Sequence, residues 1–376
     1  MFTRKTKIAL GKAILTRKSP VYVQFAVTKN CNLGCGMCAS SVSRKAEKEL
    51  SLAEIEKIAD RLEKIRAGII LLTGGEPFLR PDISQIIRIF SEKGFTVRLQ
   101  TNGTLATEEN IRQACAAGMK EVTISLNSLD PQVHDSISGQ SGSWDKTIAC
   151  FSRFSRILPP QNTLLGINTV VCRRNLKELP QIIKFATRLG FYSSLIPIHV
   201  SATAADGEFI IRKEAPDFSF RKEDFSDLDR AYREIIAMKK NGYNIYNSYK
   251  FLRSSTRFLK GQRINWHCDS PDLYFAISPS GNFLPCADLN SEISLLDGNF
   301  VDLYRSGAFR SRIRKMVGNC KGCFYACWPE ISFLCRDPRV LVERLLFGLQ
   351  TSLSTRTSVT EEQCREIIKE IKEEKG

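Results

Sequence analysis

Short apolar runs with the composition of β-strands alternate with helical patterns through the first half of the chain. The runs cover residues 21–27, 68–73, 96–102, 121–126, 166–171 and 193–200. This alternation favours a parallel sheet with helices outside it, because parallel neighbours need a long crossover connection. Six units are too few for an eight-stranded closed barrel. The sequence therefore predicts an α/β fold, a partial (β/α)6 TIM-like barrel open on one side.

The clearest helical pattern lies between the first two runs. Ser51 and Glu54 form a capping box at its start, and Gly68 follows its end. Between them, Leu52, Ile55, Ile58, Leu62 and Ile65 form one apolar stripe. Further helices are expected over residues 82–93, 107–117, 145–157, 175–189, 222–241 and 247–260.

Composition indicates a folded cytoplasmic protein whose cysteines bind metal. The 376 residues are 43% apolar, enough for a large core. No apolar run reaches eighteen residues, and the first twenty residues lack the pattern of a signal peptide. The cysteine count of 13 is odd, and thiols stay reduced in the cytosol, so metal ligation is favoured over a disulfide framework.

The formal net charge of +15 is compatible with an acidic partner such as tRNA or an anionic membrane surface. The lysines and arginines are scattered along the chain, however, and do not form one long run. Nucleic-acid binding is therefore only a minor alternative.

Three cysteines, Cys31, Cys35 and Cys38, lie within the eight residues CNLGCGMC that follow the first predicted strand. A structural zinc site needs four protein ligands, and a catalytic one usually includes histidine or carboxylate, which this loop lacks. A cubane iron–sulfur cluster held by three thiolates would keep one iron open to a small molecule. Gly34 and Gly36 would let the loop wrap closely around it.

This loop resembles the CxxxCxxC motif of the radical S-adenosylmethionine (radical SAM) superfamily in spacing and in its position after the first strand. The resemblance implies a 4Fe-4S cluster held by three cysteines, whose open iron binds SAM, and an external electron donor such as flavodoxin or ferredoxin. Reduction of SAM would release a 5'-deoxyadenosyl radical that abstracts hydrogen from a substrate. Met37 replaces an aromatic residue that commonly contacts adenine in the family.

Further family-like segments end the next predicted strands. TGGEP resembles the loop that binds the methionine amino group, which implies cofactor-binding roles for Gly74, Gly75, Glu76 and Pro77. A tight Gly-Pro turn is the alternative. ISLNS resembles an SxD pattern that meets the ribose and the carboxylate, through Ser125 and Asn127, and Asn168 lies where the family often has an asparagine. For Asn168 a purely structural role stays open.

Two other segments match the family less closely. LQTNG places Thr101 and Asn102 either toward the cavity or in a turn. HDSISG resembles HDxIRG but has Ser138 in place of arginine, so a carboxylate-binding arginine would have to come from elsewhere.

A second cysteine group resembles the SPASM or shorter twitch extension, which carries auxiliary iron–sulfur clusters. On its own, its CxxC pair would suit zinc equally well. The segments LYFAIS and NFLPC flank the turn-forming PSG and predict a hairpin within it. One auxiliary 4Fe-4S cluster is the economical interpretation, because six thiolates are too few for two. The implied metal ligands are Cys268, Cys286, Cys320 and Cys323, with Cys327 as the first substitute and Cys335 open.

The remaining cysteines and the three histidines stand alone and receive no chemical role, so no catalytic residue is assigned. His199, at the end of the sixth run, faces either the cavity or the core. A structural histidine is favoured.

Both ends of the chain are amphipathic. The first twenty residues mix lysine and arginine with Phe2, Ile8, Leu10, Ile14 and Leu15, and the segment after Pro338 carries Leu341, Leu345, Leu349 and Leu353. Peripheral contact with the inner membrane surface is one interpretation. Packing against the barrel, or closing its open side, is favoured.

The chain is predicted to divide into a basic segment (1–19), the barrel (20–215), a helical connection (216–262), a small C-terminal cysteine-rich α+β module (263–336) and C-terminal helices (337–376). The resemblance implies a radical SAM enzyme acting on a small-molecule, lipid or peptide substrate. The alternative is a basic, zinc-stabilised scaffold that binds nucleic acid without catalysis.

Overall fold

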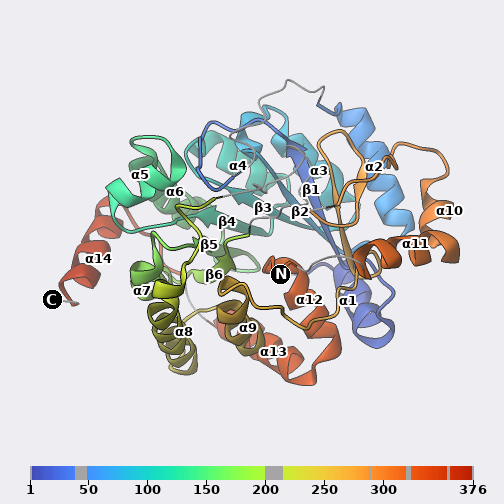
Figure 1. Cartoon of the computed structure of the whole chain (residues 1–376). Helices are drawn as coiled ribbons and strands as arrows, with labels where there is room; N and C mark the ends of the chain where they lie inside the picture. Colours follow the sequence, from blue (N-terminus) through green and yellow to red (C-terminus); the bar gives the residue numbers. More distant parts are fainter. Residues whose placement is uncertain are drawn as a thin grey trace.

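An eight-stranded sheet lies at the centre of the computed structural model, which describes residues 2–38, 49–199, 215–287, 289–318, 323–353 and 356–374 (Figure 1). The strands lie in the order β6-β5-β4-β3-β2-β1-β7-β8. Their bounds are β1 (Tyr22–Thr28), β2 (Ile69–Gly74), β3 (Thr96–Thr101), β4 (Glu121–Ser125), β5 (Leu164–Val171), β6 (Tyr192–Pro197), β7 (Tyr274–Ile277) and β8 (Phe283–Leu284). The six predicted strands are β1 to β6, all parallel and in chain order, as predicted.

The hairpin predicted around PSG forms, but it is not separate from the barrel. β7 pairs in parallel with β1, with Tyr274 opposite Tyr22 and Ile277 opposite Phe25, and β8 pairs antiparallel with β7. The sequence did not indicate this pairing, because β7 is short and its partner is the distant first strand. The cysteine-rich segment thus extends the barrel sheet.

Helices of the first half cover the outer face of the sheet. They are α2 (Leu52–Lys64), α3 (Ile83–Glu92), α4 (Glu108–Ala116), α5 (Pro131–Ser138), α6 (Ser143–Ile157) and α7 (Leu179–Arg188). In α2 the predicted capping box is present, with Ser51 and Glu54 each accepting a hydrogen bond from the other's backbone N–H. Short 3-10 turns precede or join helices at η2 (Pro77–Leu79), η3 (Leu176–Glu178) and η4 (Lys222–Asp224).

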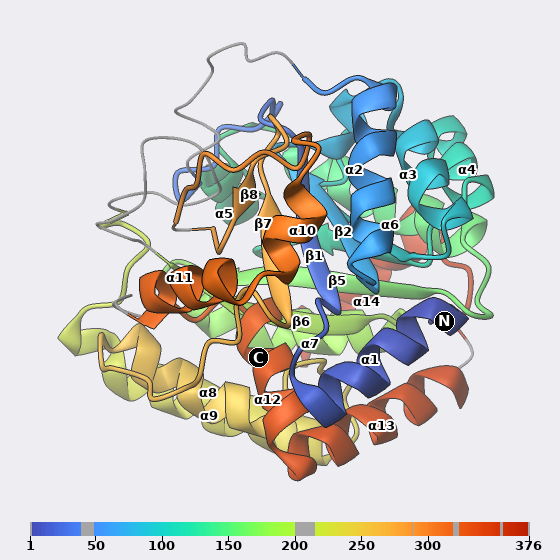
Figure 2. The same ribbon diagram turned by 90° about the vertical axis from the view of Figure 1, so that its right-hand side faces the viewer.

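The remaining helices come from the first twenty residues and from the second half of the chain (Figure 2). They are α1 (Arg4–Thr16), α8 (Phe225–Lys240), α9 (Tyr249–Leu259), α10 (Phe300–Arg305), α11 (Gly307–Gly318), α12 (Cys327–Arg336), α13 (Pro338–Leu353) and α14 (Glu361–Glu373). No helix within the described ranges has both the length and the apolar character needed to cross a bilayer.

Side chains along β1 point alternately to the two faces of the sheet, and the two faces belong to different parts of the hydrophobic core. Val23 and Phe25 pack under the outer helices, whereas Tyr22 and Ala26 point to the inside of the barrel. This period of two is what a strand buried on both faces requires. The carboxyl ends of the parallel strands consequently open together at one end of the barrel, where their loops meet.

Candidate functional site

The loop after β1 carries the three predicted cluster ligands, Cys31, Cys35 and Cys38, each partly exposed. Burial raises the pKa of the Cys31 thiol, and it raises that of Cys35 to about 12. The neighbouring thiols of the loop contribute to the rise of both pKa values. A bound metal removes such protons outright.

Among the described residues, no group of three or more cysteine, histidine, aspartate or glutamate side chains is arranged so that it could hold one metal ion. A cubane cluster makes a different demand, because each thiolate bonds its own iron. Three soft thiol donors on one short loop, each partly exposed, fit that demand.

The cysteine loop is anchored to the end of α5. The N–H groups of Gly34 and Gly36 donate to the carbonyls of Ser138 and Ile137, at 3.0 and 3.2 Å. Ser138 itself is buried, and its hydroxyl bonds that of Ser143 at 2.6 Å. The segment HDSISG thus supports the cysteine loop, and Ser138 has a structural partner where the family pattern has arginine.

The loop after β2 lies against the same cysteine loop. Gly75 N–H donates to the Thr28 carbonyl, and Glu76 N–H donates to the Asn30 carbonyl, both at 2.8 Å. A Cβ on Gly74 would lie 2.2 Å from the Thr28 oxygen, and one on Gly75 would lie 1.9 Å from the Asn30 oxygen. The close approach for which the glycines are needed is therefore to the chain itself.

We expect Gly75→Ala to separate these two loops, because the added methyl group has no space beside the Asn30 carbonyl. The free energy of unfolding should fall by roughly 2–4 kcal/mol, and SAM affinity should fall with it. Calorimetric titration and denaturant unfolding measure the two effects. Gly11→Ala is the control, since in the described structure nothing outside its own helix lies within 4 Å of the new Cβ. Wild-type SAM affinity in Gly75→Ala would contradict this account.

Glu76 joins the loops after β2 and β3 from a fully buried position. One carboxylate oxygen accepts from Phe78 N–H at 3.0 Å and from Thr101 Oγ1 at 2.7 Å, and the other accepts from Asn102 N–H at 2.7 Å. Burial raises the pKa of Glu76 to about 7. Pro77 follows as the first residue of η2 and is also buried.

A ring of polar side chains links β3 to the cysteine loop. Asn102 Nδ2 donates to Asn32 Oδ1 at 3.0 Å and lies 3.9 Å from Cys31 Sγ. Asn32 Nδ2 donates to Thr104 Oγ1 at 2.7 Å, and Thr104 donates back to Asn102 Oδ1. Asn102 thus both forms a turn and faces the cysteine loop. The sequence analysis missed Asn32, whose place inside CNLGC was its only signal.

The predicted ribose-side residues lie on β4 (Ser125), in the loop after it (Asn127) and on β5 (Asn168). Ser125 is opposite Asn168 in the strand register. Asn168 Nδ2 donates to Thr123 Oγ1 at 3.0 Å, and Asn127 Oδ1 accepts from Val170 N–H at 3.1 Å. Both asparagine side chains are therefore engaged within the barrel wall, and Ser125 is the most exposed of the three.

The two histidines near the barrel occupy apolar surroundings. Burial lowers the pKa of His134 to about 4, and its Nδ1 accepts from Asn127 N–H at 3.4 Å. The His199 ring stacks on Phe258, with ring centres 5.5 Å apart, and lies against Tyr325.

Four cysteines of the second group lie in one region of the barrel interior. Cys268, Cys286, Cys327 and Cys335 share an apolar cluster with Tyr274 and Trp328. Tyr274 Oη donates to Cys268 Sγ at 3.4 Å. Cys323 is buried next to Trp266, whose Nε1 donates to its carbonyl at 2.9 Å. Cys320 lies outside the described residues.

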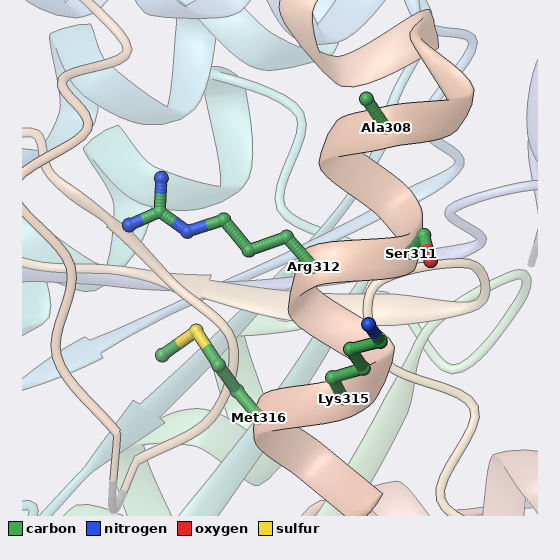
Figure 3. A pocket seen from close by; sticks show the side chains of 5 residues that line it. All are labelled: Ala308, Ser311, Arg312, Lys315 and Met316. Carbon is green, nitrogen blue, oxygen red and sulfur yellow. The ribbon is translucent and has the colours of Figure 1, made fainter.

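A shallow hollow of about 470 Å³ lies along α11 and is lined by Ala308, Ser311, Arg312, Lys315 and Met316. Arg312 and Met316 extend to the same side of the helix (Figure 3). Arg312 and Lys315 are exposed, so the hollow has a cationic border.

Comparison with known proteins identifies the class. Residues 25–186 match the model of the Radical SAM superfamily. Over 322 residues the chain is 31% identical to the AdoMet-dependent heme synthase of Oleidesulfovibrio alaskensis, a match that covers 81% of this chain and 80% of that protein. The chain belongs to the radical SAM superfamily, whose enzymes use a 4Fe-4S cluster and SAM.

Other relatives match over a shorter length. The AdoMet-dependent heme synthase of Methanosarcina barkeri is 33% identical over 178 residues, 47% of this chain and 50% of that protein. The mycofactocin maturase MftC of Mycolicibacterium smegmatis is 28% identical over 188 residues, 50% of this chain and 47% of that protein. The chain thus spans about half the length of these two relatives.

Solved structures confirm the fold. Streptococcus suis SuiB bound to the precursor peptide SuiA has a TM-score of 0.62 at 16% identity, over 82% of this chain and 70% of SuiB. Native anSMEcpe with bound AdoMet has a TM-score of 0.57 at 15% identity, over 95% and 98% of the two chains. The predicted α/β partial barrel is therefore correct.

Proposed function

We propose that Cys31, Cys35 and Cys38 hold the cluster at which SAM is reductively cleaved, and that the resulting 5'-deoxyadenosyl radical takes hydrogen from the substrate. One observation carries this assignment. The cysteine loop, the GGEP loop and Asn102 come from three successive strands and are joined by direct hydrogen bonds. A site assembled from several strand ends at the carboxyl edge of a barrel is where such folds place their chemistry.

Within this site the chain's own residues position SAM. Carbonyl groups of the loop after β2 suit the ammonium group of the methionine moiety, since an ammonium only donates hydrogen bonds. Ser125, with its partly exposed hydroxyl on β4, suits the ribose or the carboxylate. Glu76, Asn127 and Asn168 hold the surrounding loops and strands in place through the contacts described above.

Anaerobic reconstitution tests this proposal. The protein should be brown, bind about eight irons in two cubanes, and release 5'-deoxyadenosine when SAM and a reductant such as dithionite, reduced flavodoxin or ferredoxin are added. The electron paramagnetic resonance signal of the reduced cluster should change when SAM is added. A colourless protein that binds zinc and no SAM would overturn the proposal in favour of a structural scaffold.

For the second cysteine group we propose one auxiliary 4Fe-4S cluster in a SPASM- or twitch-like module over residues 263–336. Its proposed ligands are Cys268, Cys286, Cys320 and Cys323, with Cys327 as the substitute. The apolar cluster that Cys268, Cys286, Cys327 and Cys335 share around Tyr274 supports Cys268, Cys286 and the substitute Cys327 as ligands. So does the surrounding apolar packing, because burial and hydrogen bonds to sulfur set the potential of such clusters.

Tyr274→Phe should lower the reduction potential of the auxiliary cluster by roughly 20–60 mV, the equivalent of one hydrogen bond in a one-electron couple. The tyrosine hydroxyl donates to Cys268 Sγ, and its loss removes a contact that stabilises the reduced, more negative cluster. Potentiometric titration measures the shift. Tyr304→Phe is the matched control, because that hydroxyl donates to the Pro271 carbonyl in the same segment. An unchanged potential in Tyr274→Phe would exclude Cys268 as a ligand.

We further propose that the substrate is an anionic precursor of heme. The relative matched over four fifths of its length is named a heme synthase, and the exposed cations of Arg312 and Lys315 on α11 suit a carboxylate-bearing molecule. Deuterium transfer into 5'-deoxyadenosine from deuterated candidates tests this. Transfer from a peptide or a lipid, and none from a heme precursor, would overturn the substrate class and leave SAM cleavage intact.

A further inference from the structure

Helix α13 presents a stripe of large apolar side chains to solvent. Val342, Leu345, Leu346 and Leu349 are 53, 61, 60 and 61% exposed. Their spacing of three, four and seven residues places them on one face of the helix. The sequence pattern pointed to Leu341, Leu345, Leu349 and Leu353. The side chain of Leu353 lies outside the described part of the structure, and the exposed stripe includes Val342 and Leu346.

Two charged residues of α13, Glu343 and Arg344, face inward and fix this orientation. Arg344 bonds the buried carboxylate of Glu330 at 3.2 Å and lies 3.7 Å over the Tyr246 ring. Glu343 accepts from Tyr249 N–H at 2.9 Å. Rolling the helix to bury the leucines would leave Glu330 as a buried, unpaired charge, which is costly. The outward apolar stripe is therefore a fixed feature of the fold.

Helix α1 adds exposed cations and two more apolar side chains. Ile8 and Leu15 are 63 and 83% exposed. The helix contains no acidic residue. The exposed cations Arg4, Lys7, Lys12, Arg17 and Lys18 form no ion pair with any described residue. Of the seven large apolar side chains exposed in the described ranges, six lie on α1 and α13, and all six are aliphatic.

Both helices lie at the end of the barrel where the strands begin. Both pack against α12, and both lie at the lower end of the molecule in Figures 1 and 2. Thr6 of α1 donates to the Gly68 carbonyl just before β2, and Phe347 of α13 packs on Tyr192, the first residue of β6. The cysteine loop opens at the opposite end.

We propose that this α1–α13 face docks on an anionic lipid surface. Exposed aliphatic side chains bordered by lysine and arginine are the combination that binds the interface of a charged bilayer. Docking this way would leave the cysteine loop facing the aqueous phase. The proposal is independent of the reaction and of its substrate.

Two other binding partners, a second copy of the chain and a different protein, fit the α1–α13 face less well than a lipid surface does. A second copy of the chain, joined through a two-fold axis, would bring the same cations of both copies to one interface. A protein partner favours aromatic anchors and few lysines at the contact, whereas the exposed side chains described above are six aliphatic residues, three lysines and two arginines, with no aromatic residue among the large exposed apolar ones.

Sedimentation of the cluster-loaded, full-length protein with vesicles tests the proposal. Vesicles of phosphatidylcholine alone are compared with vesicles containing equal parts phosphatidylglycerol. We expect binding only to the latter, weakened at high salt. Lys7→Gln, Lys12→Gln and Lys18→Gln together should weaken binding about a hundredfold. Val342→Gln, Leu345→Gln, Leu346→Gln and Leu349→Gln together should weaken it by at least roughly tenfold.

The control replaces three exposed lysines elsewhere, Lys57, Lys64 and Lys146, by glutamine, and should bind like wild type. Thermal unfolding and 5'-deoxyadenosine release should be unchanged in all three variants. If the fourfold α13 variant does not fold, Leu345→Gln and Leu349→Gln singly take its place. No binding to the anionic vesicles, or equal loss in the control, would overturn the proposal. So would a dimer in light scattering that the α13 substitutions dissociate, since it would mean that the face pairs two copies.

Discussion

Replacing Cys31, Cys35 and Cys38 together by alanine should abolish 5'-deoxyadenosine release while the auxiliary iron signal persists. These three thiols are the cluster donors of the cysteine loop, and alanine removes every thiol from it. Without them no iron with an open position remains to bind SAM. The loop backbone should keep its place, because Gly34 and Gly36 hold it through N–H groups bonded to α5.

Iron analysis, visible absorbance and chromatography of the nucleoside products measure the outcome. The triple variant should retain about half of the iron, the share of one cubane out of two. Cys115→Ala is the matched control, because that partly exposed cysteine packs against the core on α4 and has no assigned role. Continued SAM cleavage by the triple variant would show that the site lies elsewhere.

The barrel was predictable because its signals are local. Each strand from β1 to β6 is a compact apolar run, and each helix between them has its own stripe and, in α2, its own capping box. The place of the cysteine loop followed in turn, since a loop after the first parallel strand must lie at the carboxyl edge.

The features of the fold and the site that were not predicted depend on contacts between segments far apart in the sequence. The pairing of β7 with β1 joins residues near positions 274 and 22. The sequence of a four-residue strand does not indicate which other strand it pairs with. The same holds for Asn32, whose amide acts only together with Asn102 and Thr104. The glycines of TGGEP were assigned to cofactor binding from the resemblance, and the structure shows in addition that they closely approach the Thr28–Asn30 backbone, a contact that no local signal indicated.

Glu76→Ala should lower the free energy of unfolding by about 3–5 kcal/mol, because two buried donors and one part-buried donor lose their acceptor at once. Those donors are Phe78 N–H, Thr101 Oγ1 and Asn102 N–H, which tie the end of β2 to the end of β3. Since Asn102 in turn contacts the cysteine loop, SAM affinity should fall as well. Thr101→Val, which removes one of the three bonds to Glu76 together with the acceptor of Gly103 N–H, should have a smaller effect on stability than Glu76→Ala.

Glu76→Gln separates the two roles that this carboxylate could have. If its negative charge bound the SAM ammonium group directly, glutamine would lose as much SAM affinity as alanine. Both carboxylate oxygens, however, are occupied by donors of the chain, and the side chain is fully buried. The amide oxygen of glutamine can still accept hydrogen bonds from Phe78 N–H and Thr101 Oγ1. Two of the three hydrogen bonds that connect the loops should therefore remain. We therefore expect Glu76→Gln to keep most of its SAM affinity in calorimetric titration. A well-folded Glu76→Gln protein that binds SAM as poorly as Glu76→Ala would show instead that the charge itself is required.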